Sequence, residues 1–505
     1  MNQLLNRILI LYIKLNKKLL VLLGFCIVLF VYFFNLMAIG PEYDELLSIN
    51  AALNCPSNMF IERIFWVQNQ CVPLMLSPYI GGLTAIIYRI FFVFIPSSVL
   101  TFRLINLALL FLGVFLLYIS IKRITTIKVA LYTVFLLFFD FQLWFNIRFD
   151  RPSAIPFLIK NLFIFLFISY IKNKKTSWLI LAGLVMGLNI WTKFDSFFFY
   201  ISILMPFLFY YWQNITIKKV IYFLTGVFIG IFPFILYLVI SIHRFFLVSL
   251  QIGKSDSIEK IIEKISLIFY QFSSFDAIWY IFRQETTVSF VIIVVTIILW
   301  IFNIVALKSL WKNKLNKSLI SSLLIFLFLF LLYGGMISAH HRFLIFPIPQ
   351  FLLASYFVTR KNILSVVFFF LYIIIFFHSY LLVYTQTQTI GSIGAFTKQV
   401  YPLSEYLNKM DTEILIGDWG IATQLVFLLN NPKNIYEISY STNTENSKGI
   451  DLDSLKRIKN CKYILLHKNK QVIFKNSDNN LRSLISGSLV YTDPVYELWK
   501  CKQVE

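Results

Sequence analysis

The chain has 505 residues, 59% of them hydrophobic and 14% charged, and its mean hydropathy is +0.76. This composition excludes an ordinary soluble domain and is typical of a polytopic helical membrane protein. The formal net charge of +21 does not indicate a nucleic-acid-binding protein, because the basic residues stand in short runs between hydrophobic segments, as the positive-inside rule describes.

The first hydrophobic segment, Leu19–Ile39, follows a basic N-terminus at residues 1–18. It is not followed by a small-residue cleavage site, so we predict a retained membrane anchor. The basic residues before it place the N-terminus in the cytoplasm and the residues after it on the external side.

Three carboxylates stand directly after this segment, in the sequence Gly40-Pro41-Glu42-Tyr43-Asp44-Glu45. Carboxylates next to lipid are costly, so an acidic cluster here is a candidate functional site. The alternative is a solvated interfacial loop without chemistry.

Residues 40–100 form a predicted external segment that contains one further apolar stretch, Tyr79–Pro96. Arg89 interrupts this stretch, and counting it as a crossing would place the later basic loops outside. We therefore predict an interfacial or re-entrant helix.

Ten more crossings complete a predicted transmembrane domain over residues 19–384, with eleven crossings in all. They are expected at Thr101–Ile121, Val129–Asn146, Ser153–Ile171, Trp178–Thr192, Ser196–Trp212, Val220–Ile240, Thr287–Leu307, Ser318–Ser338, Phe343–Val358 and Ile363–Tyr384. The predicted cytoplasmic segments hold 18 Lys and Arg and no Asp or Glu. The basic residues determine the orientation, and the missing acids support it.

A second external segment is expected at residues 243–286. Its apolar residues recur at helical spacing opposite charged ones, at Ile258, Ile261, Ile262, Ile265, Ile268 and Phe272. This pattern predicts an amphipathic helix on the membrane surface, and a helix packed on the protein's own loops fits it equally well.

Residues 385–505 differ in composition, with 14 Lys and Arg against 12 Asp and Glu. Short apolar strands at Glu413–Gly417, Asn434–Ile438, Lys462–His467 and Val495–Lys500 alternate with helical stretches at Ile421–Leu429 and Leu452–Ile458. We predict a small α/β domain, which lies outside by the parity of the crossings.

The cysteines suggest two disulfides on the external side. Cys55 and Cys71 share the first external segment, Cys461 and Cys501 share the C-terminal domain, and Cys26 is an apolar residue of the first span. The first pair is the more strongly expected, because it closes a loop in a segment with little core of its own. The sequence has no CxxC or His-rich tract that would predict a structural metal.

Charged residues also stand at the external ends of four later spans. They are Arg148, Asp150 and Arg151 after the third span, Lys193 after the fifth, His243 after the seventh, and His341 with Arg342 after the ninth, with Lys160 inside the fourth. Any one basic residue there could be a snorkelling anchor, but the recurrence favours a site. Cations beside lipid suit a lipid phosphate, and a carboxylate beside them suits a general base.

The order of these features resembles the integral-membrane glycosyltransferases of the C-type (GT-C) fold, closest to the branch of protein O-mannosyltransferases and lipid A aminoarabinose transferases. The motifs that carry the resemblance are Pro41-Glu42-Tyr43-Asp44-Glu45, the stretch from Pro73 to Gly82 with Tyr79, Arg103, Arg148-Phe149-Asp150-Arg151-Pro152, the stretch from Gly187 to Lys193, and His341-Arg342-Phe343-Leu344 with Pro347 and Pro349.

The resemblance implies an all-α GT-C-like fold with a small external α/β domain, and an inverting transfer from a polyprenyl-phosphate sugar. Asp44 would be the general base, Glu45 would support it, and Asp150 matches a second acidic position. The groups near the donor phosphate would be Arg148, Arg151, Lys193, His341 and Arg342, and further candidate site residues are Glu42, Tyr79, Arg103 and His243.

One departure concerns the first external loop, where many relatives carry a basic residue before Pro-Pro and this chain has Gln70-Cys71-Val72-Pro73. That contact to the phosphate is therefore not predicted here. Some C-type enzymes need a divalent metal and others do not, so the sequence assigns no cofactor.

We therefore expect a glycosyltransferase of the cytoplasmic (inner) membrane that acts on a glycan, lipid or protein acceptor at the external face, with membrane lipids as partners and no nucleic acid. A transporter or lipid flippase is the main alternative, because intramembrane charges also serve transport. The hydropathy shows no internal repeat of the kind common in transporters. A membrane anchor for a C-terminal binding module would not need eleven spans.

Overall fold

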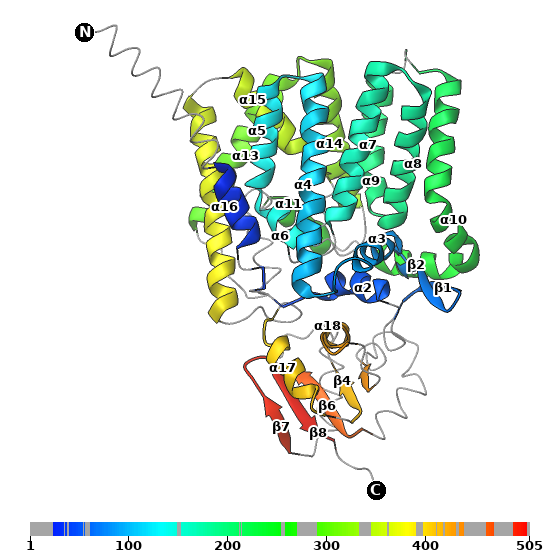
Figure 1. Cartoon of the computed structure of the whole chain (residues 1–505). Helices are drawn as coiled ribbons and strands as arrows, with labels where there is room; N and C mark the ends of the chain where they lie inside the picture. The colour runs from blue at the N-terminus through cyan, green and yellow to red at the C-terminus, as the bar shows by residue number, and fades with distance from the viewer. Residues whose placement is uncertain are drawn as a thin grey trace.

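The computed structural model describes residues 24–34, 36–37, 40–53, 55, 61–148, 153–211, 213, 215–253, 258–269, 290–332, 345–360, 363–389, 397–410, 412–417, 420–430, 434–438, 461–468 and 488–501. These residues form a helical bundle with a small α/β unit at one end (Figure 1). The predicted fold class, a helical membrane protein with a C-terminal α/β region, is confirmed.

A helix occupies each segment that was predicted to cross the membrane. These helices are Gly24–Phe33, α4 (Val99–Ile124), α5 (Ile127–Phe138) with α6 (Phe141–Arg148), α7 (Ala154–Asn173), α8 (Thr176–Thr192), α9 (Ser196–Tyr211), α10 (Ile217–Gly253), α13 (Phe290–Leu310), α14 (Lys314–Leu332), α15 (Ile348–Thr359) and α16 (Ile363–Thr389). Within the described chain, six are long and apolar enough to span a bilayer, or seven if the bent α5–α6 pair is one span. The predicted count of eleven crossings is not confirmed, because the described parts of the other helices have only 10–17 residues.

Helices α8 and α10 pack through glycines spaced four residues apart on both. A Cβ atom added at Gly183 of α8 would lie 2.2 Å from the Phe223 carbonyl oxygen, and one added at Gly226 of α10 would lie 2.1 Å from the Ile180 carbonyl oxygen. Gly187 and Gly230 repeat this arrangement one turn further along. Small residues at this spacing let two membrane helices approach backbone to backbone.

The segment at residues 40–100, predicted to be external, is more structured than its sequence suggested. It contains α2 (Tyr43–Ala52), the antiparallel sheet β1 (Arg63–Val67), β2 (Gln70–Ser77) and β3 (Ile80–Gly81), and α3 (Leu83–Phe92). The β1–β2 turn places Gln68 and Asn69 at φ 48° and 63°, the signs that a tight hairpin turn needs. Helix α3 has ten residues and is too short to cross a bilayer, as predicted for Tyr79–Pro96.

Helix α10 kinks at Ser241, two residues before the predicted start of the segment at residues 243–286. The amphipathic helix predicted there is present as α11 (Ile258–Phe269). Ile262 and Ile265 are exposed, whereas the buried Lys264 donates a hydrogen bond to the Leu331 carbonyl in the last turn of α14. Helix α11 therefore packs on the protein with one face and exposes apolar side chains on another.

The C-terminal unit contains a mixed five-stranded sheet in the order β5-β4-β6-β8-β7. Strands β4 (Ile414–Ile416), β5 (Ile435–Glu437), β6 (Tyr463–His467) and β8 (Tyr496–Lys500) confirm the four predicted strands, and α18 (Ile421–Leu428) confirms one predicted helix. Strand β7 (Leu489–Thr492) and α17 (Val400–Leu407) were not predicted, and Leu452–Ile458 lies outside the described residues.

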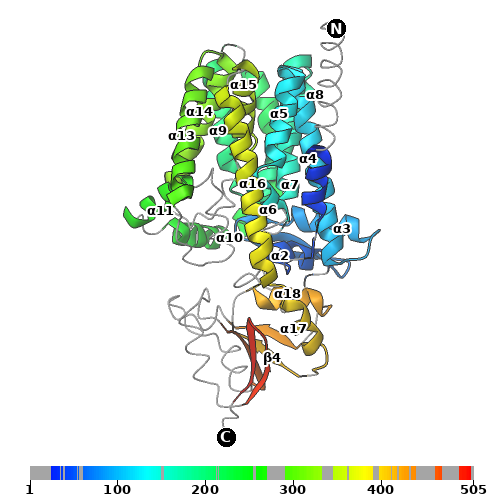
Figure 2. The same cartoon turned by 90° about the vertical axis from the view of Figure 1, so that its left-hand side faces the viewer.

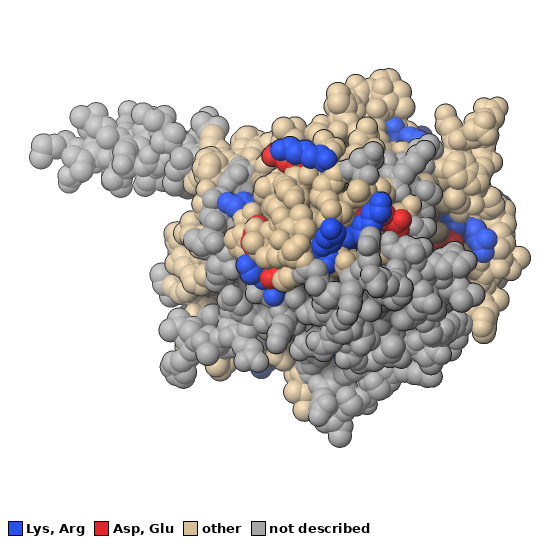
Figure 3. Space-filling model, turned by 90° about the horizontal axis from the view of Figure 1, so that it is seen from below, with Lys and Arg blue, Asp and Glu red and all other residues tan. Residues whose placement is uncertain are grey.

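Helices α17 and α18 lie between this sheet and the bundle (Figure 2). On the end of the molecule that carries the unit, the described Lys and Arg are interspersed with Asp and Glu (Figure 3).

Both expected disulfides are present, Cys55–Cys71 and Cys461–Cys501, and Cys26 is free.

Candidate functional site

Two of the three clustered carboxylates, Glu42 and Glu45, form hydrogen bonds with backbone N–H groups at the start of α2. Because the helix begins at Tyr43, Glu42 is its N-cap residue and Glu45 is the third residue of its first turn. The Glu45 N–H donates to Glu42 Oε2 and the Glu42 N–H donates to Glu45 Oε2, each at 3.2 Å. This reciprocal pair is a capping box, and both carboxylates also interact favourably with the positive end of the helix dipole.

Arg103 of α4 binds the Glu45 carboxylate with a two-pronged contact. Its Nε donates to Oε1 and its Nη2 donates to Oε2, both at 3.0 Å. The same guanidinium donates to the backbone carbonyls of Leu36 and Gly40, before α2. Arg103 and Glu45 are only 1% and 2% exposed, so the pair is buried.

Both oxygens of the buried Glu45 carboxylate accept hydrogen bonds from the Arg103 guanidinium. Burial raises the pKa of its carboxyl, while the Arg103 guanidinium and the Glu42 N–H act in the opposite direction. A charge-assisted fork of this kind fixes orientation. Glu45 and Arg103 therefore set the geometry of the first turn of α2, which carries Asp44; the Asp44 side chain itself lies outside the described residues.

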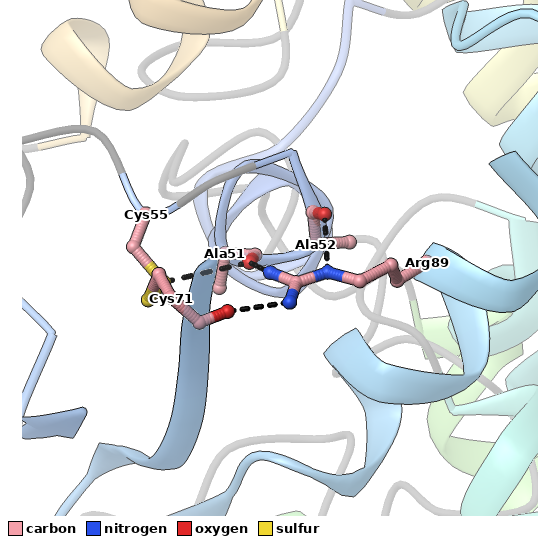
Figure 4. The surroundings of a disulfide bond; sticks show 5 residues. All are labelled: Ala51, Ala52, Cys55, Cys71 and Arg89. Atoms are coloured by element: carbon pink, nitrogen blue, oxygen red, sulfur yellow. Dashed lines mark hydrogen bonds between the residues drawn. A yellow bond between two sulfur atoms is a disulfide. The ribbon is translucent and has the colours of Figure 1, made fainter. Parts of the chain in front are cut away.

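A second arginine, Arg89 of α3, holds the other end of α2 (Figure 4). Its Nε donates to the Ala52 carbonyl at 2.9 Å, its Nη2 to the Ala51 carbonyl at 3.0 Å, and its Nη1 to the Cys71 carbonyl beside the disulfide. Carbonyls in the last turn of a helix lack partners within the helix, and a cation there is stabilising. This contact explains the charge that interrupts the apolar stretch around Arg89.

Lys193 and Tyr79 are brought together at the end of α8. Lys193 forms an isolated strand bridge with Ile80, and the Phe194 N–H donates to the Tyr79 carbonyl at 2.9 Å. The Lys193 ammonium lies 3.3 Å from the Asp195 carboxylate and is 15% exposed. The cation therefore lies beside a neighbouring acid, and its backbone is bonded to the segment that contains Tyr79 and Ile80.

The remaining predicted residues are placed only in part. Asp150, Arg151, His341 and Arg342, and the side chain of Arg148, lie outside the described residues, so their convergence stays a prediction. His243 is exposed on α10 just after the kink. Lys160 is 3% exposed on α7, with its ammonium 4.8 Å from the centre of the Phe199 ring.

Asp140, which sequence reasoning missed, lies where α5 and α6 meet at 62°. Its Oδ1 accepts the Gln142 and Leu143 N–H groups at 2.9 and 3.3 Å, and so caps α6. Its Oδ2 accepts from Gln350 Nε2 at 2.9 Å and from the Tyr372 hydroxyl at 2.6 Å. The sequence signal was an acid inside the apolar span Val129–Asn146, a position where acids are rare and functional.

The described part of the chain contains no group of three His, Cys, Asp or Glu side chains that could hold a metal ion. The structure therefore assigns no metal ligands.

The sequence profile of the family described as dolichyl-phosphate-mannose-protein mannosyltransferase matches residues 78–240. No curated protein matches the chain. Among solved structures, ArnT from Cupriavidus metallidurans bound to undecaprenyl phosphate is 13% identical and has a TM-score of 0.61, with 95% of this chain and 97% of that chain covered. Its apo form is 12% identical with the same TM-score, and the coverages are 97% and 99%.

The archaeal oligosaccharyltransferase AglB from Archaeoglobus fulgidus, in complex with an inhibitory peptide and a dolichol-phosphate, is 11% identical over 95% of this chain and 74% of that chain. Its TM-score is 0.48. The similarity to ArnT confirms the GT-C-like fold predicted from the motif order.

Proposed function

We propose that the protein is a membrane glycosyltransferase that moves a sugar from a polyprenyl-phosphate donor to an acceptor on the external face. The observation that carries the proposal is α2, an acid-bearing helix fixed by Arg103 and Arg89 at one end of the bundle. The GT-C-like fold and the family match over residues 78–240 support it. ArnT binds a polyprenyl phosphate in the same fold, which supports a donor of that class.

In the proposed mechanism, Asp44 accepts the proton of the acceptor hydroxyl or amine as its oxygen or nitrogen attacks the anomeric carbon. The bond from that carbon to the phosphate oxygen breaks, and polyprenyl phosphate leaves with the bonding electrons. Fixed cations stabilise the charge that develops on the phosphate, with Lys193 and Arg342 as the main candidates. Attack on the face opposite the leaving group inverts the anomeric centre.

Orientation in the membrane is a separate prediction. The basic turns that join α4 to α5 and α7 to α8 lie at the opposite end of the bundle from α2 and the C-terminal unit (Figure 1). Disulfides persist on oxidising faces, so the end with Cys55–Cys71 and Cys461–Cys501 is proposed to be external.

Single cysteines introduced at Lys174 and Lys314 should be shielded from an impermeant maleimide, whereas those at Lys254 and Lys448 should react. Labelling of position 254 only after permeabilisation would contradict this orientation.

The proposed activity is tested by mass analysis of envelope glycans, lipids and glycoproteins from cells with and without the protein. Loss of the protein should remove one sugar substituent and leave its polyprenyl-phosphate sugar unused. Loss of a flippase for the donor would also remove the substituent, but the purified protein would then transfer no sugar from a polyprenyl-phosphate donor. That second result would contradict the proposal and favour the transport alternative.

A further inference from the structure

The C-terminal unit contacts α2 directly through α18. Gln424 is fully buried and donates from Nε2 to the Pro41 carbonyl at 2.7 Å, just before α2 begins. Asn50, near the other end of α2, donates from Nδ2 to the Thr423 carbonyl at 2.9 Å. The donor is on α18 in the first hydrogen bond and on α2 in the second. Together they join one turn of α18 to both ends of α2.

Close backbone packing accompanies these bonds. Gly420, the N-cap residue of α18, has φ +87°, and a Cβ atom added to it would lie 3.2 Å from Cβ of Tyr43. A Cβ atom added at Gly40 would lie 2.1 Å from the Thr397 carbonyl oxygen. The C-terminal unit therefore packs directly against the start of α2.

From this packing we infer that α18 is a positioning element for the acid-bearing turn of α2, and that Gln424 is the positioning residue. Gln424 fixes Pro41 and Arg103 fixes Glu45, so Asp44 lies between two points held by different parts of the molecule. A catalytic group misplaced by about 1 Å can lose on the order of 10² in rate. The C-terminal unit would thus be needed for turnover without touching the sugar. This inference depends on the proposed function.

The test compares Gln424→Met with Gln399→Met in the full-length protein. Methionine keeps a long unbranched side chain but cannot donate to Pro41. Gln399 lies in the same unit, where it is the N-cap residue of α17, and its side chain makes no capping hydrogen bond. With a short-chain polyprenyl-phosphate sugar as donor, Gln424→Met should lower kcat by about 10- to 100-fold and leave the donor KM within about twofold, whereas Gln399→Met should match the wild type.

A double-mutant cycle distinguishes positioning from general damage. In an Asp44→Asn background, Gln424→Met should cause no further loss of turnover, because its effect acts through Asp44. Equal losses in both backgrounds, or an unchanged kcat, would overturn the inference.

Hydrogen exchange gives a readout that does not depend on activity. Amides of residues 43–50 should exchange faster in Gln424→Met than in Gln399→Met, and equal rates would overturn the positioning role. Faster exchange together with a wild-type protein that transfers no sugar would reject the proposed function and leave the fixation of α2 supported.

Discussion

The variant Asp44→Asn should transfer sugar about 10²–10⁴-fold more slowly than the wild type, the usual contribution of a positioned general base. Asparagine keeps the size and hydrogen-bonding shape of the side chain but cannot accept a proton at neutral pH. Donor binding should persist, because the base acts on the acceptor while cations hold the phosphate. Turnover is measured with purified protein, and donor affinity with a short-chain polyprenyl phosphate.

Two further variants serve as a control and a comparison for Asp44→Asn. Glu405→Gln neutralises an exposed acid on α17 and should leave turnover unchanged. Lys193→Ala should weaken donor binding as well as turnover, because a cation at the phosphate stabilises ground and transition states alike. If Asp44→Asn is folded and inserted and keeps near wild-type turnover, Asp44 only supports the start of α2. Asp150 would then be the next candidate, since Glu45 is bound by Arg103.

The largest expected effect on stability comes from Arg103→Met. This change leaves the Glu45 carboxylate buried without its guanidinium partner, and breaking a buried ion pair from one side typically costs about 3–5 kcal/mol. The carbonyls of Leu36 and Gly40 lose a donor at the same time. Thermal unfolding of the detergent-purified protein should therefore begin at a markedly lower temperature than in the wild type.

The double variant Arg103→Met with Glu45→Gln should be more stable than Arg103→Met alone. Glutamine can still accept the Glu42 N–H and keep the capping box, but it carries no charge that needs a partner. Replacement of a buried ion pair by neutral groups of similar volume is often tolerated. Equal unfolding temperatures for the single and double variants would mean that the pair contributes little, and that α2 is held mainly by Arg89 and α18.

Features that depend on one segment at a time could be predicted from the amino-acid sequence. Hydropathy located the helices of the bundle, because burying a helix in lipid requires a long run of apolar side chains whatever its neighbours are. Apolar stretches bounded by polar residues located β4, β5, β6 and β8. The helix α11 followed from its 3.6-residue periodicity, and the two disulfides followed from which cysteines share a segment.

The partners of the charged residues, by contrast, could be found only in the folded chain. Arg103 and Glu45 are 58 residues apart, and Asp140 binds side chains 210 and 232 residues away. In the sequence, Arg89 only interrupts an apolar stretch. In the fold, α3 packs against the end of α2, and Arg89 donates to the Ala52 carbonyl there. Periodicity and composition report which face of an element is apolar, but a buried charge is stabilised by partners on other elements, and those partners are fixed by packing. For that reason the acids after the first span could be found in the sequence, whereas the burial of Glu45 against Arg103 could be found only in the fold.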